Sequence, residues 1–208
     1  MLAGWGSLAS VCAILWAALV GKSAISDYRT QKIVDKEVDA ADSALTAAYR
    51  AFDAIDQMRG RWIPAAESHA AEEALGTAGL DLAHMDDATK RANVTRGVIY
   101  RRAEFFKSDF DAIFEAIPAA KVYFGPDAVD WLKEFPKARN RLLNSADMLG
   151  LAAIPNNDDR DFAVKVRRDV FGAGPDEQDE VKDMVSVALQ KLEDRLLPQL
   201  RTEKAVEK

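Results

Sequence analysis

The sequence predicts an all-α protein, with an N-terminal transmembrane helix followed by an antiparallel bundle of four or more helices. Apolar residues recur with helical spacing along most of the chain. Helix breakers are few, with 11 glycines and 7 prolines among 208 residues. A long uncharged stretch at the start adds the membrane segment. We therefore expect a single anchor over residues 1–22, a helical bundle domain over 23–201 and a polar tail over 202–208.

Composition excludes several classes of protein. The chain is 49% hydrophobic and 30% charged, which is typical of one globular domain rather than of a disordered chain. Its net charge of −6 argues against a general nucleic-acid binder, which would normally carry a basic face. Cys12 is the single cysteine, so the chain has neither an intrachain disulfide nor a cysteine-based zinc site.

Residues 2–20 contain no charged side chain and are followed by Gly21 and Lys22. A helix of this length spans about 28 Å, close to the ~30 Å of a bilayer's hydrocarbon core. Trp5 and Trp16 lie toward its two ends, where tryptophan favours the membrane interface. These residues predict a membrane anchor that carries Trp5, Trp16 and Lys22.

Three alternatives for this stretch stay open, because its first half is small and only moderately hydrophobic. A cleaved signal peptide would have a positive charge before the apolar run, and none is present. A buried core helix would usually be shorter and keep a polar edge. Gly6 and Ser10 form a small-xxx-small pair, which could serve a dimerising face.

Basic residues predict the orientation of the anchor. Lysine or arginine is absent before the stretch, and four such residues follow within about 15 positions. They are Lys22, Arg29, Lys32 and Lys36. The positive-inside rule then places the bulk of the chain in the cytoplasm. The organisation has the general look of small bacterial single-pass proteins with helical cytoplasmic domains but matches the motif of no family, and we expect the bacterial inner membrane.

From residue 23 to about residue 59 the apolar pattern predicts one long helix, since no helix-breaking residue interrupts it. Its apolar positions step by four and three residues, as in the a/d stripe of a coiled coil. They are Val34, Val38, Ala41, Leu45, Ala48, Phe52, Ile55 and Trp62. The abundance of alanine favours close packing inside a bundle over a long isolated coiled coil. The anchor is expected to run directly into this helix.

A short helix is expected over residues 66–75, with Ser68 as a possible cap and with glycines ending it. Asp86 or Asp87 then caps a long helix that Pro118 interrupts. The apolar stripe of that helix is Val94, Val98, Ile99, Phe105, Phe106, Phe110, Ile113, Phe114 and Ile117. A further turn or two is expected over residues 119–124.

Asp127 caps the next predicted helix, which runs to about Leu149 and ends at Gly150. A turn cluster within residues 152–159 forms a loop. A short helix, rather than a strand, is expected over Phe162–Phe171, and Asp176 caps the last helix. An aromatic cluster around the Gly125 turn is expected to pack in the core rather than to line a pocket. Its members are Tyr123, Phe124, Trp131 and Phe135.

No residue set predicts catalysis or a cofactor: the chain has no glycine-rich phosphate loop and no nucleophile elbow. His69, Glu72 and Glu73 share a helical face and are weak candidates for metal ligands. A di-iron carboxylate bundle would need several more such residues, so a solvated face is favoured. A basic cluster could bind an anion or an acidic partner, although a solvated face is favoured here too. It consists of Arg96, Arg101, Arg102 and Lys107.

These patterns predict a membrane-tethered helical interaction or scaffolding protein without enzymatic activity. Its expected partners are the lipid bilayer and either a protein partner or a second copy of the chain, with no nucleic acid. The alternative is a ligand- or metal-binding sensor, or an enzyme, with a pocket within the bundle near His69, Glu72 and Glu73. An envelope protein with its domain exported is a third class.

Overall fold

The computed structural model describes the backbone of residues 3–152, 160–174 and 177–206, and the side chains of 28–150, 160–174 and 177–201. These residues form seven α-helices, one short 3-10 helix and no strand, which confirms the predicted helical bundle. The elements are α1 (Ala3–Met58), α2 (Ala65–Thr77), η1 (Leu82–His84), α3 (Asp87–Phe105), α4 (Lys107–Phe124), α5 (Pro126–Ala152), α6 (Arg160–Phe171) and α7 (Glu180–Val206).

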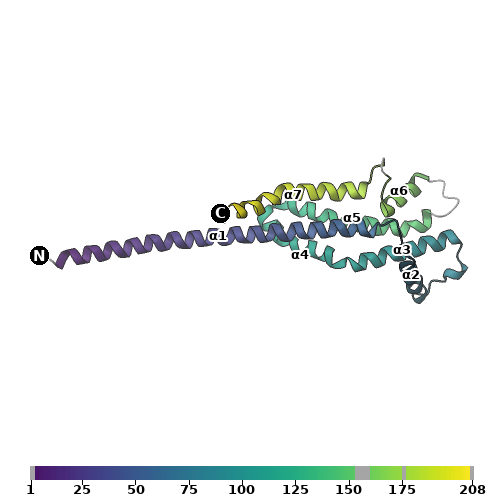
Figure 1. The fold of residues 1–208 in the computed structure, drawn as a ribbon, viewed down its shortest axis with the longest axis horizontal. Helices are drawn as coiled ribbons and strands as arrows, with labels where there is room; N and C mark the ends of the chain where they lie inside the picture. Colours follow the sequence, from purple (N-terminus) through teal and green to yellow (C-terminus); the bar gives the residue numbers. More distant parts are fainter. Residues whose placement is uncertain (1–2, 153–159, 175–176, 207–208) are drawn as a thin grey trace.

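Helix α1 runs along most of the length of the molecule (Figure 1). It has 56 residues, about 84 Å at 1.5 Å per residue. Its C-terminal part runs inside the bundle beside α4, α5 and α7, whereas its N-terminal part projects beyond them. The opposite end of the bundle, where α1 ends and where α2 and α6 lie, is called the distal end below.

Within the bundle α1 buries two neighbouring seams. Ala41, Leu45, Ala48 and Ile55 are buried, which confirms the middle of the predicted stripe. A second seam is also buried and is almost entirely alanine: Ala40, Ala44, Ala47, Ala51, Ala54 and Met58. Two seams give a wide apolar face, which allows α1 to pack against α4 and α7 as well as α5.

The ends of the predicted stripe are wrong. Val34 is 49% exposed and Trp62 is 77% exposed. Val34 lies before the first buried residues of α1, and Trp62 lies in the connection after α1 ends. Neither residue is covered by neighbouring helices, although both keep the helical spacing.

The core lies between α1, α4, α5 and α7. Its largest fully buried side chains include Phe135, Ile55, Met58, Ile113, Leu132, Leu142, Leu192 and Leu196. Phe124 and Phe135 are buried, and Tyr123 and Trp131 are half-buried against the same core. This confirms the prediction that the aromatic cluster packs in the core.

The long helix predicted from Asp86 is two helices. Helix α3 ends at Phe105 and α4 begins at Lys107, with Phe106 between them at φ −90° and ψ 12°. This break changes the direction of the apolar stripe, so that Phe105 is 79% exposed instead of buried. Phe114, also predicted to be buried, is 55% exposed on α4. Pro118 lies inside α4 and does not interrupt it.

Two predicted ends of α5 also differ. The helix begins at Pro126, so Asp127 lies in its first turn and is not its cap. Proline suits the first position of a helix because its missing N–H would have no partner there. Helix α5 continues through Gly150 to Ala152.

The caps of α3 and α7 are aspartates. The Asp86 carboxylate accepts hydrogen bonds from the backbone N–H groups of Ala88 and Thr89, each at 2.9 Å, as predicted. Asp176, the predicted cap of α7, lies outside the described residues. The helix begins four residues later, where the backbone N–H of Lys182 donates to Asp179 Oδ1 at 3.0 Å.

The predicted anchor, residues 2–20, lies outside the part of the chain whose side chains the structure describes. Within the part that it does describe, no helix is both long enough and apolar enough to cross a membrane. The backbone of α1 is helical without a break from Ala3 to Met58.

Candidate interaction site at the distal end

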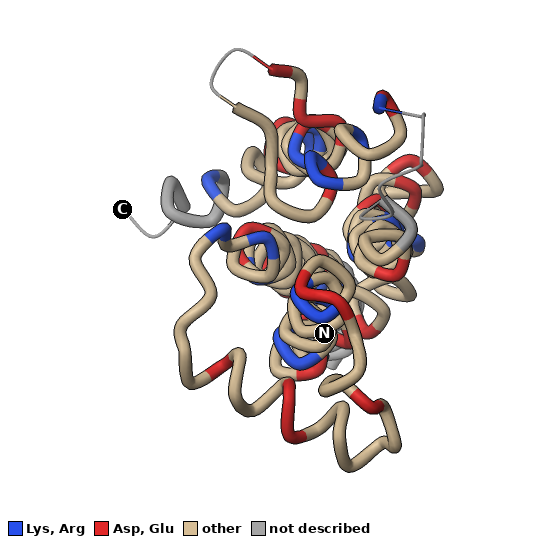
Figure 2. Tube along the Cα trace, turned by 90° about the vertical axis from the view of Figure 1, so that its right-hand side faces the viewer, with Lys and Arg blue, Asp and Glu red and all other residues tan. Residues whose placement is uncertain are grey.

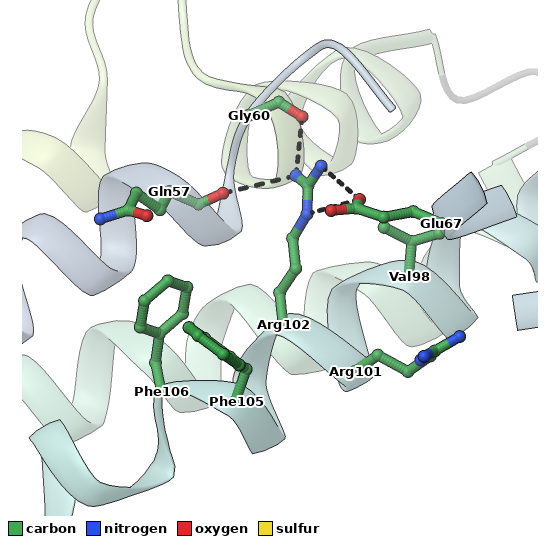
Figure 3. A pocket seen from close by; sticks show the side chains of 8 residues that line it. All are labelled: Gln57, Gly60, Glu67, Val98, Arg101, Arg102, Phe105 and Phe106. Carbon is green, nitrogen blue, oxygen red and sulfur yellow. Dashed lines mark hydrogen bonds and ion pairs between the residues drawn. The ribbon is translucent and has the colours of Figure 1, made fainter. Parts of the chain in front are cut away.

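A groove of about 480 Å³ lies at the distal end, where the end of α1, the start of α2 and the last turns of α3 meet (Figure 3). It is lined by Gln57, Gly60, Glu67, Val98, Arg101, Arg102, Phe105 and Phe106. The lining includes no histidine, cysteine or serine, so it offers no nucleophile and base pair of the usual kind.

Arg102 holds one wall of the groove in place. Its Nε and Nη2 donate to Glu67 Oε2 at 3.0 and 2.7 Å. The same guanidinium donates to the carbonyl oxygens of Gly60 and Trp62, each at 3.1 Å. Carbonyl groups beyond the end of a helix lack intrahelical partners, so Arg102 ties the end of α1 to α2 and α3.

The rim of the groove is aromatic. The rings of Phe105 and Phe106 meet edge to face, with centroids 4.9 Å apart. Phe106 packs on the core, whereas Phe105 is 79% exposed. Phe105 therefore places an exposed aromatic ring on the rim of the groove.

Acidic and basic positions are interspersed over the distal end (Figure 2), and the predicted basic cluster is mostly neutralised. Arg96 pairs with Asp147 at 2.9 Å, and Lys107 pairs with Asp111 at 3.2 Å. Arg102 is neutralised by Glu67. Arg101, which lines the groove, forms no hydrogen bond or ion pair within the described part of the chain. The structure therefore leaves one unpaired cation beside the groove.

A buried polar network fixes the elements at the distal end. The Arg59 side chain is 5% exposed, and its Nη2 pairs with Asp179 Oδ1 at 2.8 Å. Arg59 also donates to the carbonyl oxygens of Arg168 and Asp169, at 2.8 and 2.9 Å. One side chain thus satisfies carbonyl groups in the last turn of α6 and pairs with the cap of α7.

Asp169 is the second centre of this network. Its carboxylate is buried and accepts both guanidinium bonds of Arg141, at 2.9 and 3.0 Å. The Ser145 hydroxyl donates to the same carboxylate at 3.1 Å. Arg141 also pairs with Glu180 of α7. The network therefore links α5, α6 and α7 at the end of the bundle that carries the groove.

Opposing effects act on the pKa of Asp179. Burial disfavours its charged form and so raises the pKa. The hydrogen bond from Arg59 and the backbone N–H groups of Lys182 and Ala173 favour the charged form more strongly, and they hold the pKa below its ordinary value. The folded protein therefore stabilises the ionised carboxylate.

The weak metal candidates do not gather. His69 and Glu73 are exposed on α2, and Glu72 is half-buried, with its Oε1 3.7 Å from Lys90 Nζ. Across the described residues, no three His, Cys, Asp or Glu side chains are placed to hold a metal ion. None of the three candidates lines the groove beside Phe105.

Sequence reasoning missed Arg59 and Asp169. A usable signal for Asp169 was present, because a carboxylate lies among the buried valines of α6, next to Val166 and Val170. A charge on the buried face of a helix needs a partner. For Arg59 no such signal exists, because its partners, two backbone carbonyls and the Asp179 carboxylate, are all more than 100 positions away in the sequence.

Comparisons of this chain with protein-family models, with curated proteins and with solved structures find no match.

Proposed function

We propose that this chain is a membrane-tethered interaction protein that presents its distal end to a partner protein. The observation that carries this proposal is the continuity of α1. One unbroken helix includes the uncharged stretch at its start and contributes Gln57 to the groove at its end. A membrane anchor and a binding groove at the two ends of one helix would set the groove at a fixed height above the bilayer.

The anchor is supported by the sequence. Residues 2–20 carry no charge and Lys22 follows them, so the segment is suited to span a bilayer once. The basic residues after it favour a cytoplasmic position for the bundle, and the inner membrane of a bacterium is the location that we propose. The distal end would then face the cytoplasm, away from the membrane.

A separate partner protein is favoured over pairing of two copies along α1. Where α1 runs beside the bundle, its exposed face is largely polar or charged, with Asp42, Thr46, Arg50 and Asp53 along it. The most exposed large apolar side chains of α1, Tyr28, Ile33 and Val34, lie before the first buried residue of the helix. A coiled coil between copies would need an apolar seam on that face. The groove beside Phe105 offers an aromatic contact instead.

Co-purification from native membranes tests this function. A chain with a C-terminal tag would be compared with Phe105→Ser, which alters the groove rim. Phe114→Ser is the matched control, since Phe114 is also exposed but does not line the groove. The unaltered chain and Phe114→Ser are expected to retain a stoichiometric partner that Phe105→Ser loses. The same yield of partner from all three, or no partner from any, would contradict the proposal.

A small-molecule sensor is the second candidate. The groove volume of about 480 Å³ falls in the usual range for ligand sites of ~300–1,000 Å³. A thermal-shift screen together with metal analysis of the pure chain separates this function from the first. A large shift with a small molecule, or a stoichiometric metal, would favour the sensor.

A further inference from the structure

We propose that the groove beside Phe105 binds a partner segment that carries both an apolar side chain and a carboxylate. This inference rests on the proposed function, because it names the chemistry of the partner that the distal end would recognise.

The apolar part of the partner is set by the groove wall. Phe105 and Phe106 form one side with their rings edge to face, and Val98 lies about two turns before Phe105 on α3. Phe105 is 79% exposed, so covering it would remove a large apolar surface from water. A cavity of about 480 Å³ has room for one or two apolar side chains.

The acidic part follows from the charges that line the groove. Arg102 is held by Glu67, and these two charges cancel. Arg101 is left without a counter-charge in the described part of the chain, so the lining has a surplus of one positive charge. This local sign is opposite to the net charge of −6 of the whole chain. A carboxylate on the partner would complete the pair, whereas a lysine there would be repelled.

Figure 3 shows how the lining residues lie: the rings of Phe105 and Phe106 are on one side of Arg102, and the Arg101 side chain extends to its other side. Arg102 points toward the end of α1 and the start of α2, where its donors are occupied. Arg101 extends from the neighbouring position of α3 and leaves its guanidinium unoccupied. The two arginines therefore have different roles, one in the wall of the groove and one toward a partner.

Peptide titration by calorimetry tests the proposal. The full-length chain would be held in lipid nanodiscs, so that detergent cannot compete for the groove. The probes are two synthetic 12-residue peptides, one of leucine and glutamate and the other with lysine in place of every glutamate. We expect the acidic peptide to bind at least about fivefold more tightly than the basic one, the scale of one partly exposed ion pair. Equal affinities, or no binding of either peptide at 1 mM, would overturn the proposal.

Two substitutions identify the site. Arg101→Glu should weaken the acidic peptide about fivefold and strengthen the basic one, while the same change at Arg50, on the exposed face of α1, should alter neither. Phe105→Ser should weaken the acidic peptide about tenfold, and Phe114→Ser should not. If Arg101→Glu and Arg50→Glu had equal effects, the binding would depend on overall charge and not on the groove. If Phe105→Ser and Phe114→Ser had equal effects, it would depend on any exposed apolar residue. Either result would overturn the proposal.

Failure of the proposed function would be distinguishable. Charge-selective peptide binding by a chain that retains no partner from membranes would leave the groove chemistry standing and remove the tethered interaction role. A partner retained equally by Arg101→Glu and Phe105→Ser would support an interaction role through another surface and remove the groove.

Discussion

Replacing Arg59 with methionine is expected to lower the free energy of unfolding by roughly 3–5 kcal/mol. Methionine keeps most of the volume but removes the charge. Asp179 would then lose the cation 2.8 Å away that offsets its burial, and the carbonyls of Arg168 and Asp169 would lose their donor. Urea denaturation followed by circular dichroism measures the change.

Arg61→Met is the matched control. Arg61 is exposed and donates only to the carbonyl oxygens of Phe171, Gly172 and Ala173. Removing the Arg61 side chain should lower the free energy of unfolding by about 1 kcal/mol, the usual net contribution of such hydrogen bonds. Equal losses in the two variants would contradict the central position of Arg59.

The same network predicts a direction for the pH dependence of stability. The folded-state pKa of Asp179 is lowered, so its contribution is present above the unfolded pKa of about 3.9. That contribution is lost as the pH falls through the folded pKa. In Arg59→Met the acid-induced loss of stability should be smaller, since the hydrogen bond that lowers the pKa is gone.

Phe135→Ala is expected to lower the free energy of unfolding by about 3–5 kcal/mol, the usual range for truncating a buried phenylalanine. The side chain is fully buried in the middle of α5, and the core around it would close only partly over the space left. Thermal and urea unfolding of the variant would report the loss.

Phe105→Ala provides the comparison for this second substitution. The residue type is the same, but Phe105 is 79% exposed, so the cost should stay within about 0.5 kcal/mol. Comparable destabilisation at the two positions would show that Phe105 packs against the bundle and is not free on the rim of the groove.

The helices were predictable because their signals are local. The scarcity of helix breakers and the helical spacing of apolar residues identify most of the helices, including the uninterrupted helix from the uncharged stretch into the bundle. An aspartate at a helix start identifies the cap at Asp86. The second buried seam of α1 was hidden because it consists almost only of alanine, which sequence reasoning does not separate from a neutral surface residue. The break at Phe106 was hidden because neither proline nor glycine marks it.

The groove was only partly predictable. Arg101 and Arg102 belonged to a basic cluster whose neutralisation was expected. Which of the two is paired depends on Glu67, which lies 35 positions away from Arg102. The spacing of Phe105 with the other apolar residues predicted a core position. The residue is exposed because the helix breaks directly after it, at Phe106. Contacts between distant segments therefore decided the site, while local patterns decided the helices.

Membrane extraction tests the membrane tether most directly. Membranes from cells that express the full-length chain, and the same chain without residues 2–20, would be washed with alkaline carbonate. The tethered account predicts that the full-length chain stays with the membrane pellet and that the shortened chain is released. Recovery of the full-length chain in the soluble fraction would contradict it.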